Sequence, residues 1–136
     1  MRLSPDRWLS AATLLAFAGW LATVGPVRTW ASGAGLRDAW LIGVAPSLLA
    51  AVTMALWIRL RARSHPLLAS VLAVALTAFA EAAQVWMPRQ TADPGDVVAG
   101  VVGGAVAWPL LRWHANATAR RALNDGTAEC ERAGRR

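Results

Sequence analysis

Long charge-free apolar segments alternate with short polar ones along the chain. Two runs, 8–27 and 39–58, each hold 20 positions without a charged side chain, and 64–80 and 97–111 hold 17 and 15 more. A helix of about 20 apolar residues crosses the ~30 Å hydrocarbon core of a bilayer. The pattern therefore predicts an all-α fold, a polytopic membrane protein with four transmembrane helices in an antiparallel bundle. The predicted spans lie near residues 8–27, 40–58, 66–87 and 96–113.

These runs also predict the domain organisation. We expect residues 1–113 to form one transmembrane domain, and residues 114–136 to form a basic, polar cytoplasmic tail that starts as a short helix and is partly disordered. The connection between the third and fourth spans is short and contains Pro88 and Pro94-Gly95, so these spans should be antiparallel neighbours. Gly25-Pro26 ends the first span, where we expect ordinary helix geometry, with a proline kink as the alternative.

The arginines predict the orientation in the membrane. With the N-terminus inside, the segments on that side carry 11 of the 14 arginines, and the loops on the other side carry three. Basic residues accumulate on the cytoplasmic side of membrane proteins. We therefore expect a multi-pass protein of the bacterial cytoplasmic (inner) membrane, with both termini cytoplasmic and the segment from Met87 to Gly95 facing outward.

Composition excludes several classes of protein. Charged residues make up 16% of the chain, against about 25% in a soluble domain, and hydrophobic residues make up 56%. The sequence pI near 11.6 reflects arginines that flank membrane spans, so we do not expect a nucleic-acid partner. Cys130 has no second cysteine to pair with, and with His65 and His114 it has no metal-ligand spacing. No metal and no cofactor are predicted.

One polar segment interrupts the apolar pattern at the end of the third span. Glu81 lies about 9 Å below the outer end of this helix, at 1.5 Å per residue. A carboxylate inside the hydrocarbon layer faces the bundle or a water-filled cavity, because exposure to lipid costs several kcal/mol. Thr77, Glu81 and Gln84 share one helix face. We predict an outward polar pocket formed by Glu81, Gln84, Arg89, Asp93 and Asp96.

The start of the fourth span supplies the neighbouring features. Asp96 precedes an apolar run and is predicted to cap the helix N-terminus. Gly100 and Gly104 have the GxxxG spacing that lets another helix approach closely, and Gly103 lies between them. We expect these glycines to pack against the alanine-rich third helix, which would bring Asp96 against the Glu81 face.

This segment resembles the VanZ-like family of small bacterial membrane proteins. The resemblance covers about residues 79–108 and rests on Glu81-x-x-Gln84-x-x-x-Pro88, followed by Asp93-x-x-Asp96 and Gly103. Two positions differ, because the family's Arg stands one position later than Arg89 and its Asn is replaced by Gly100. The resemblance implies a four-span envelope protein, and the founding member is associated with low-level resistance to the glycopeptide teicoplanin.

Three functions are compatible with these features. The first is binding or modulation of an envelope lipid, a cell-wall precursor or a lipophilic drug in the outward pocket, where Arg89 would engage anionic groups. The second is an intramembrane enzyme in which Glu81 and Asp96 act as an acid–base pair on a lipid or precursor. The third is a small proton-coupled transporter, which is disfavoured because the first span carries no acid. The sequence leaves homo-oligomerisation open.

Overall fold

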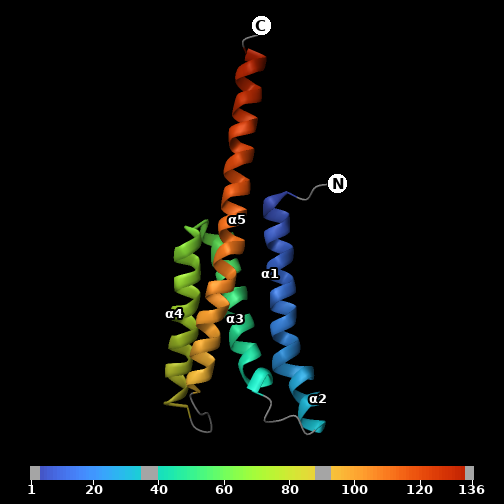
Figure 1. Cartoon of the computed structure of the whole chain (residues 1–136), viewed down its shortest axis with the longest axis vertical. Helices are drawn as coiled ribbons and strands as arrows, with labels where there is room; N and C mark the ends of the chain where they lie inside the picture. Colours follow the sequence, from blue (N-terminus) through green and yellow to red (C-terminus); the bar gives the residue numbers. More distant parts are fainter. Residues whose placement is uncertain (1–3, 35–39, 88–92, 134–136) are drawn as a thin grey trace.

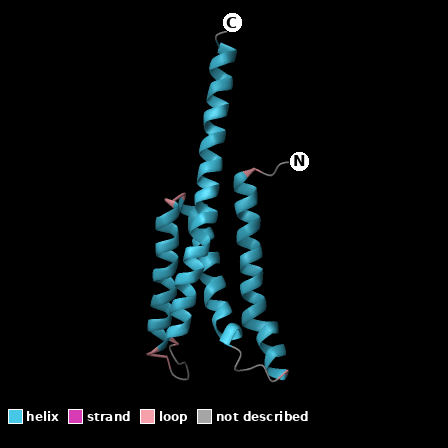
Figure 2. Cartoon of the chain, in the orientation of Figure 1, coloured by secondary structure: helices cyan, strands magenta, loops and turns pink. Residues whose placement is uncertain are grey.

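A computed structural model describes residues 4–34, 40–87 and 93–133, and all their regular structure is helical (Figure 2). The predicted all-α class is confirmed, and four helices are long and apolar enough to cross a membrane, which indicates a multi-pass membrane protein. The elements are α1 (Pro5–Ala22), the π-helix η1 (Thr23–Val27), α2 (Arg28–Gly33), α3 (Trp40–Ala62), α4 (Pro66–Gln84) and α5 (Pro94–Ala133).

The spans that follow one another in the chain run antiparallel and lie side by side, whereas α3 and α5 run in the same direction (Figure 1). α5 packs against both α3 and α4, and α3 also packs against α1 and α4. Both termini lie at one end of the bundle, together with the turn between α3 and α4 (Figure 1). The start of α5 and the end of α4 lie at the opposite end. We call these the arginine-rich end and the acidic end, after Arg59, Arg63 and Arg112 at one and Glu81 and Asp96 at the other.

Local sequence accounts for where the helices begin. Ser4 caps α1, where its Oγ accepts a hydrogen bond from the Arg7 N–H at 3.4 Å, and Pro5 occupies the first helical turn. α4 likewise begins at Pro66, whose ring suits the first turn of a helix. The break before α4 is made by Arg63, which has φ of +48° and ends α3 in the left-handed region that usually favours glycine.

The core consists of a few large side chains surrounded by small ones. Leu9, Leu56 and Leu111 are the largest fully buried side chains, and they come from α1, α3 and α5. Val52 and four alanines complete the cluster: Ala55, Ala69, Ala73 and Ala107. Large apolar side chains elsewhere stay exposed, as expected for a surface that faces lipid. The small residues let the helix backbones approach each other closely.

Three helices extend beyond the predicted spans, and α3 does so by one turn, to Ala62. The first helix continues past residue 27 as α2. Between α1 and α2, in η1, Pro26 lacks an N–H and the backbone forms a π-turn. α5 continues to Ala133, across most of the segment for which we predicted a short helical start and a partly disordered tail. The reason is that alanine and arginine favour helix, and extending an existing helix needs no new nucleus.

Candidate functional site

The polar site at the acidic end begins with Glu81, which lies near the end of α4. Only 7% of Glu81 is exposed, although its neighbours Phe79 and Trp86 are largely exposed. Helical spacing explains this difference, because Thr77, Glu81 and Gln84 share the face of α4 that turns toward the bundle. Thr77, one turn before Glu81, contacts α5 at Gly100. The carboxylate is therefore directed between helices.

The two carboxylate oxygens of Glu81 have different surroundings. Oε1 accepts a hydrogen bond of 3.1 Å from the Gln84 side-chain amide, Nε2. Oε2 is buried and has no hydrogen-bond partner among the described residues. A buried polar atom without a partner costs about 1–3 kcal/mol, so a group that donated to Oε2 would bind favourably. One oxygen thus accepts a hydrogen bond from within α4, and the other is buried without a partner in the described part of the chain.

The first turn of α5 contributes two more carboxylates. Asp93, not Asp96, caps this helix: its Oδ1 accepts a hydrogen bond from the Gly95 N–H at 2.8 Å, and Pro94 follows as the first helical residue. The prediction that Asp96 is the cap is therefore wrong. Asp96 lies within the first turn, and its Oδ1 accepts a hydrogen bond of 2.8 Å from the Ser47 hydroxyl of α3.

Electrostatic interactions connect these groups to Glu81. The carboxylates of Asp96 and Asp93 lie near enough to that of Glu81 to repel its negative charge. The Asp93 backbone N–H attracts the same charge. α3, α4 and α5 thus bring together Ser47, Glu81, Gln84, Asp93 and Asp96, from the buried Glu81 to the exposed Asp93. Arg89, the predicted cation of the site, lies outside the described residues. The described part of the site is acidic, which favours hydrogen-bond donors and cations as ligands.

Ser47 was not predicted from the sequence. Its signal was weak but present, because a hydroxyl directly follows Pro46 inside an apolar run. A proline in a helix frees a backbone carbonyl, and small polar residues often accompany such positions in membrane helices. Ser47 matters because it ties α3 to the start of α5 and orients the Asp96 carboxylate.

The three glycines of α5 that were predicted to pack against another helix lie at close helix contacts. A Cβ atom at Gly100 would lie 2.9 Å from Thr77 Cγ2, and one at Gly104 would lie 2.4 Å from Val74 Cγ2, so both glycines face α4. Gly103 faces α3 instead, where an added Cβ would lie 2.5 Å from the Leu48 carbonyl oxygen. These contacts set the distance between α5 and its neighbours, and they place Asp96 one turn from the Thr77 contact.

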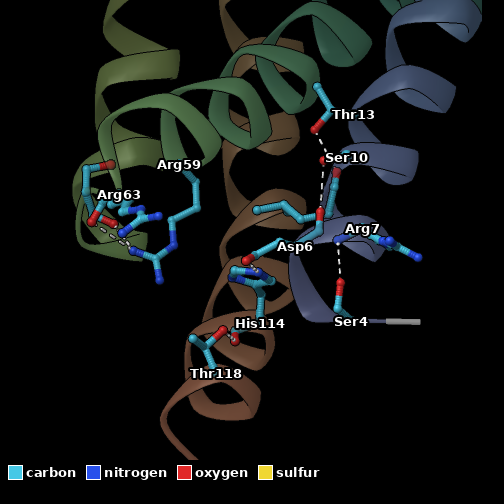
Figure 3. Close-up of polar contacts among 11 residues, drawn as sticks. Ser4, Asp6, Arg7, Ser10, Thr13, Arg59, Arg63, His114 and Thr118 are labelled. Carbon is cyan, nitrogen blue, oxygen red and sulfur yellow. Dashed lines mark hydrogen bonds and ion pairs between the residues drawn. The ribbon is translucent and has the colours of Figure 1, made fainter. Parts of the chain in front are cut away.

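A second polar cluster, at the arginine-rich end, was not predicted as a site (Figure 3). Nε2 of the buried His114 on α5 lies 3.4 Å from Oδ1 of the exposed Asp6 on α1. Arg59, at the end of α3, interacts electrostatically with the same imidazole. Edge-to-face packing of Trp8 and Trp113, with ring centroids 4.9 Å apart, joins α1 to α5 at this end as well. These contacts hold α1 against the other helices.

The chemistry of the acidic site is that of hydrogen-bond acceptance and proton exchange by carboxyl groups. In the part of the chain that the structure describes, no three His, Cys, Asp or Glu side chains gather in a way that would hold a metal ion. The chain matches no family model, no curated protein and no solved structure.

Proposed function

We propose that this chain is a bacterial cytoplasmic-membrane protein that binds or modulates an envelope lipid, a cell-wall precursor or a lipophilic drug at its acidic end. The observation that carries the proposal is the buried Oε2 of Glu81, which has no hydrogen-bond partner among the described residues and lies near the carboxylate of Asp96. Ionisable groups inside a membrane protein are costly and usually serve a function. A ligand that donates hydrogen bonds to Oε2 would remove much of this cost.

The chemistry of the site narrows the class of ligand. Three carboxylates lie near one another, and Gln84 and Ser47 already donate to two of them. The preferred polar group is therefore an ammonium, an amide or a hydroxyl, and the lipid-facing surfaces of α4 and α5 suit an apolar tail. Amphiphiles with amine- or amide-rich heads combine both features. Envelope lipids, lipid-linked precursors and glycopeptides with an acyl chain are of this kind.

The distribution of arginine supports an outward-facing acidic end. The segments at the other end carry 11 of 14 arginines, which by the charge bias of membrane proteins makes that end, with both termini, cytoplasmic. Membership of the VanZ-like family, and with it a contribution to low-level glycopeptide resistance, remains part of the proposal. It rests on the resemblance of residues 79–108.

A second candidate function uses the same residues as an acid–base pair. The electrostatic interaction of Glu81 with Asp96 favours it, because two adjacent carboxyl groups can share and transfer a proton. In this alternative the protein is an intramembrane enzyme that acts on a lipid or cell-wall precursor. Incubation of the purified protein with lipid-linked precursor distinguishes the two functions, since only the enzyme converts the precursor into product.

Replacing Glu81 with glutamine tests the binding proposal. The change keeps the size of the side chain but removes the charge-assisted acceptor, and such hydrogen bonds contribute about 1.5–3 kcal/mol. We expect the Kd for the recognised ligand to rise at least tenfold. The probes are phosphatidylethanolamine, lipid-linked cell-wall precursor and teicoplanin, each titrated against the protein in nanodiscs of phosphatidylcholine.

The matched control is Asp125→Asn, which removes one carboxylate from an exposed position on α5 far along the helix. Binding should be the same for this variant as for the wild type. If Glu81→Gln and Asp125→Asn bind every probe as the wild type does, Glu81 is not a ligand-binding group and the proposal is wrong.

A further inference from the structure

A basic cavity lies at the arginine-rich end, on the far side of the bundle from Glu81. It has a volume of about 670 Å³ and lies between the α3–α4 turn and α5. Its basic lining comes from Arg59, Arg63, His65 and Arg112, and no carboxylate contributes to the lining. The cavity therefore attracts an anion.

Two guanidinium groups of this basic cavity, those of Arg59 and Arg112, are held in place without carboxylates. Arg59 Nη1 donates hydrogen bonds to the backbone carbonyls of Arg63, at 3.1 Å, and of Ser64 (Figure 3). Arg112 stacks over the Trp108 ring, with its Cζ 5.5 Å from the ring centroid. Among the described residues, none of these three arginines forms an ion pair with an acid. The guanidinium groups of Arg59 and Arg112 are therefore positioned, and none of the three is neutralised by an ion pair in the described part of the chain.

An apolar groove continues from the basic cavity along α4 and α5. It has a volume of about 480 Å³ and shares two lining residues, Leu67 and Trp108, with the basic cavity. Its other walls are mainly small or aliphatic: Val71, Val74, Ala75, Gly104 and Ala105. From Leu67 to Ala75 the groove follows α4 for about 12 Å, at 1.5 Å per residue. Its depth depends on Gly104 and Ala105, which carry little or no side chain.

A basic cavity joined to an apolar groove matches one class of ligand. We infer that this α4–α5 face binds an anionic phospholipid, with the phosphate in the basic cavity and one acyl chain in the groove. Arginine suits phosphate because its fork of N–H donors can bind two oxygens at once. Basic pockets between transmembrane helices recognise anionic head groups, and Trp108 is suited to the headgroup layer. A free phosphate would use only the cavity and leave the groove unexplained.

The test measures lipid retention by native mass spectrometry of the full-length protein in detergent, with phosphatidylglycerol, phosphatidylcholine or inorganic phosphate added. The double variant Arg63→Gly with Arg112→Gln removes two of the basic groups. Glycine at position 63 suits the left-handed backbone there, so the turn is retained. Arg61→Gln is the control, because Arg61 is an exposed arginine at the end of α3, two positions before Arg63, that does not line the cavity.

We expect the wild type to bind phosphatidylglycerol at least tenfold more tightly than phosphatidylcholine. The double variant should lose this preference, and Arg61→Gln should keep it. Equal affinity for the two lipids would overturn the inference. So would equal weakening by the double variant and by Arg61→Gln, because binding would then depend on the overall positive charge of this end and not on the cavity.

A groove-filling variant separates a lipid from a free phosphate. Ala105→Leu adds side-chain volume to the groove at an exposed position, so the helix contacts are unaffected. We expect it to weaken phosphatidylglycerol binding at least fivefold, with the melting temperature unchanged. If Ala105→Leu binds phosphatidylglycerol normally, and inorganic phosphate competes with that lipid at equal concentration, the site is a phosphate site and the groove has no role.

Discussion

Replacing Gly103 with alanine is expected to destabilise the bundle by about 3 kcal/mol. The added Cβ would lie 2.5 Å from the Leu48 carbonyl oxygen and 3.0 Å from Ala51 Cβ, so it would overlap the backbone of α3. A flexible side chain could rotate away, but a helix backbone moves only if α3 and α5 separate. Overpacking of this kind costs about 1–3 kcal/mol, and more where the backbone must shift.

The matched control for this prediction is Gly126→Ala, on the same helix. A Cβ at Gly126 would meet no atom within 4 Å, and alanine favours helix over glycine by roughly 0.5–1 kcal/mol. Reversible unfolding in mixed detergent micelles should therefore show a large loss of unfolding free energy for Gly103→Ala and a small gain for Gly126→Ala. Equal stability of the two variants would show that α3 and α5 are not packed as described.

Replacing Leu111 with alanine is expected to cost about 2–3 kcal/mol of unfolding free energy. Leu111 is 0% exposed and lies in the core cluster with Leu9 and Leu56. Burial of a leucine in a soluble protein contributes up to about 5 kcal/mol, part of which is transfer from water. Inside a membrane, lipid replaces water, so mainly the lost packing and the cavity remain.

The neighbouring Leu110 provides the control for this second prediction. Leu110 is 37% exposed, at the surface that faces lipid, so its truncation leaves no internal cavity. The same unfolding measurement should show a change of less than about 1 kcal/mol for Leu110→Ala. If Leu110→Ala were as costly as Leu111→Ala, α5 would present a different face to the bundle.

The fold class could be predicted from the sequence because lipid imposes a simple length rule. Charge-free runs of 15–20 residues indicated four spans, and the structure has four helices long and apolar enough to cross a membrane. The ends of the helices were harder to predict, because they depend on local backbone chemistry. Pro26 is accommodated by a π-turn, and α5 continues to Ala133 because its polar residues still favour helix.

The candidate site could be predicted only in part, for a related reason. Glu81 stands out because a carboxylate in an apolar run needs an explanation. Ser47 does not stand out, because its role depends on which face of α3 meets α5. Asp93 caps α5 in place of Asp96 because Pro94 suits the first helical position and makes the preceding residue the cap. His114 and Asp6, which contact each other, are 108 positions apart in sequence. The hydrophobic periodicity of each helix carries no information on such pairs.

The central claim is that the Glu81 face of α4 meets the start of α5, and a cysteine pair tests it most directly. Thr77 lies one turn from Glu81, and Gly100 lies one turn from Asp96. A Cβ at Gly100 would lie 3.3 Å from Thr77 Cβ, close to the roughly 3.5–4.5 Å found in disulfides. The Thr77→Cys change also removes the Cγ2 methyl that would otherwise obstruct position 100.

The measurement is disulfide formation after addition of a mild oxidant to native membranes, in a Cys130→Ser background, followed by mass spectrometry. We predict that Thr77→Cys with Gly100→Cys forms the disulfide rapidly and nearly completely. Thr77→Cys with Val98→Cys should not form it, because Val98 is 59% exposed on the face of α5 that turns to lipid. A disulfide in the second pair, or none in the first, would contradict the placement of Glu81 against Asp96.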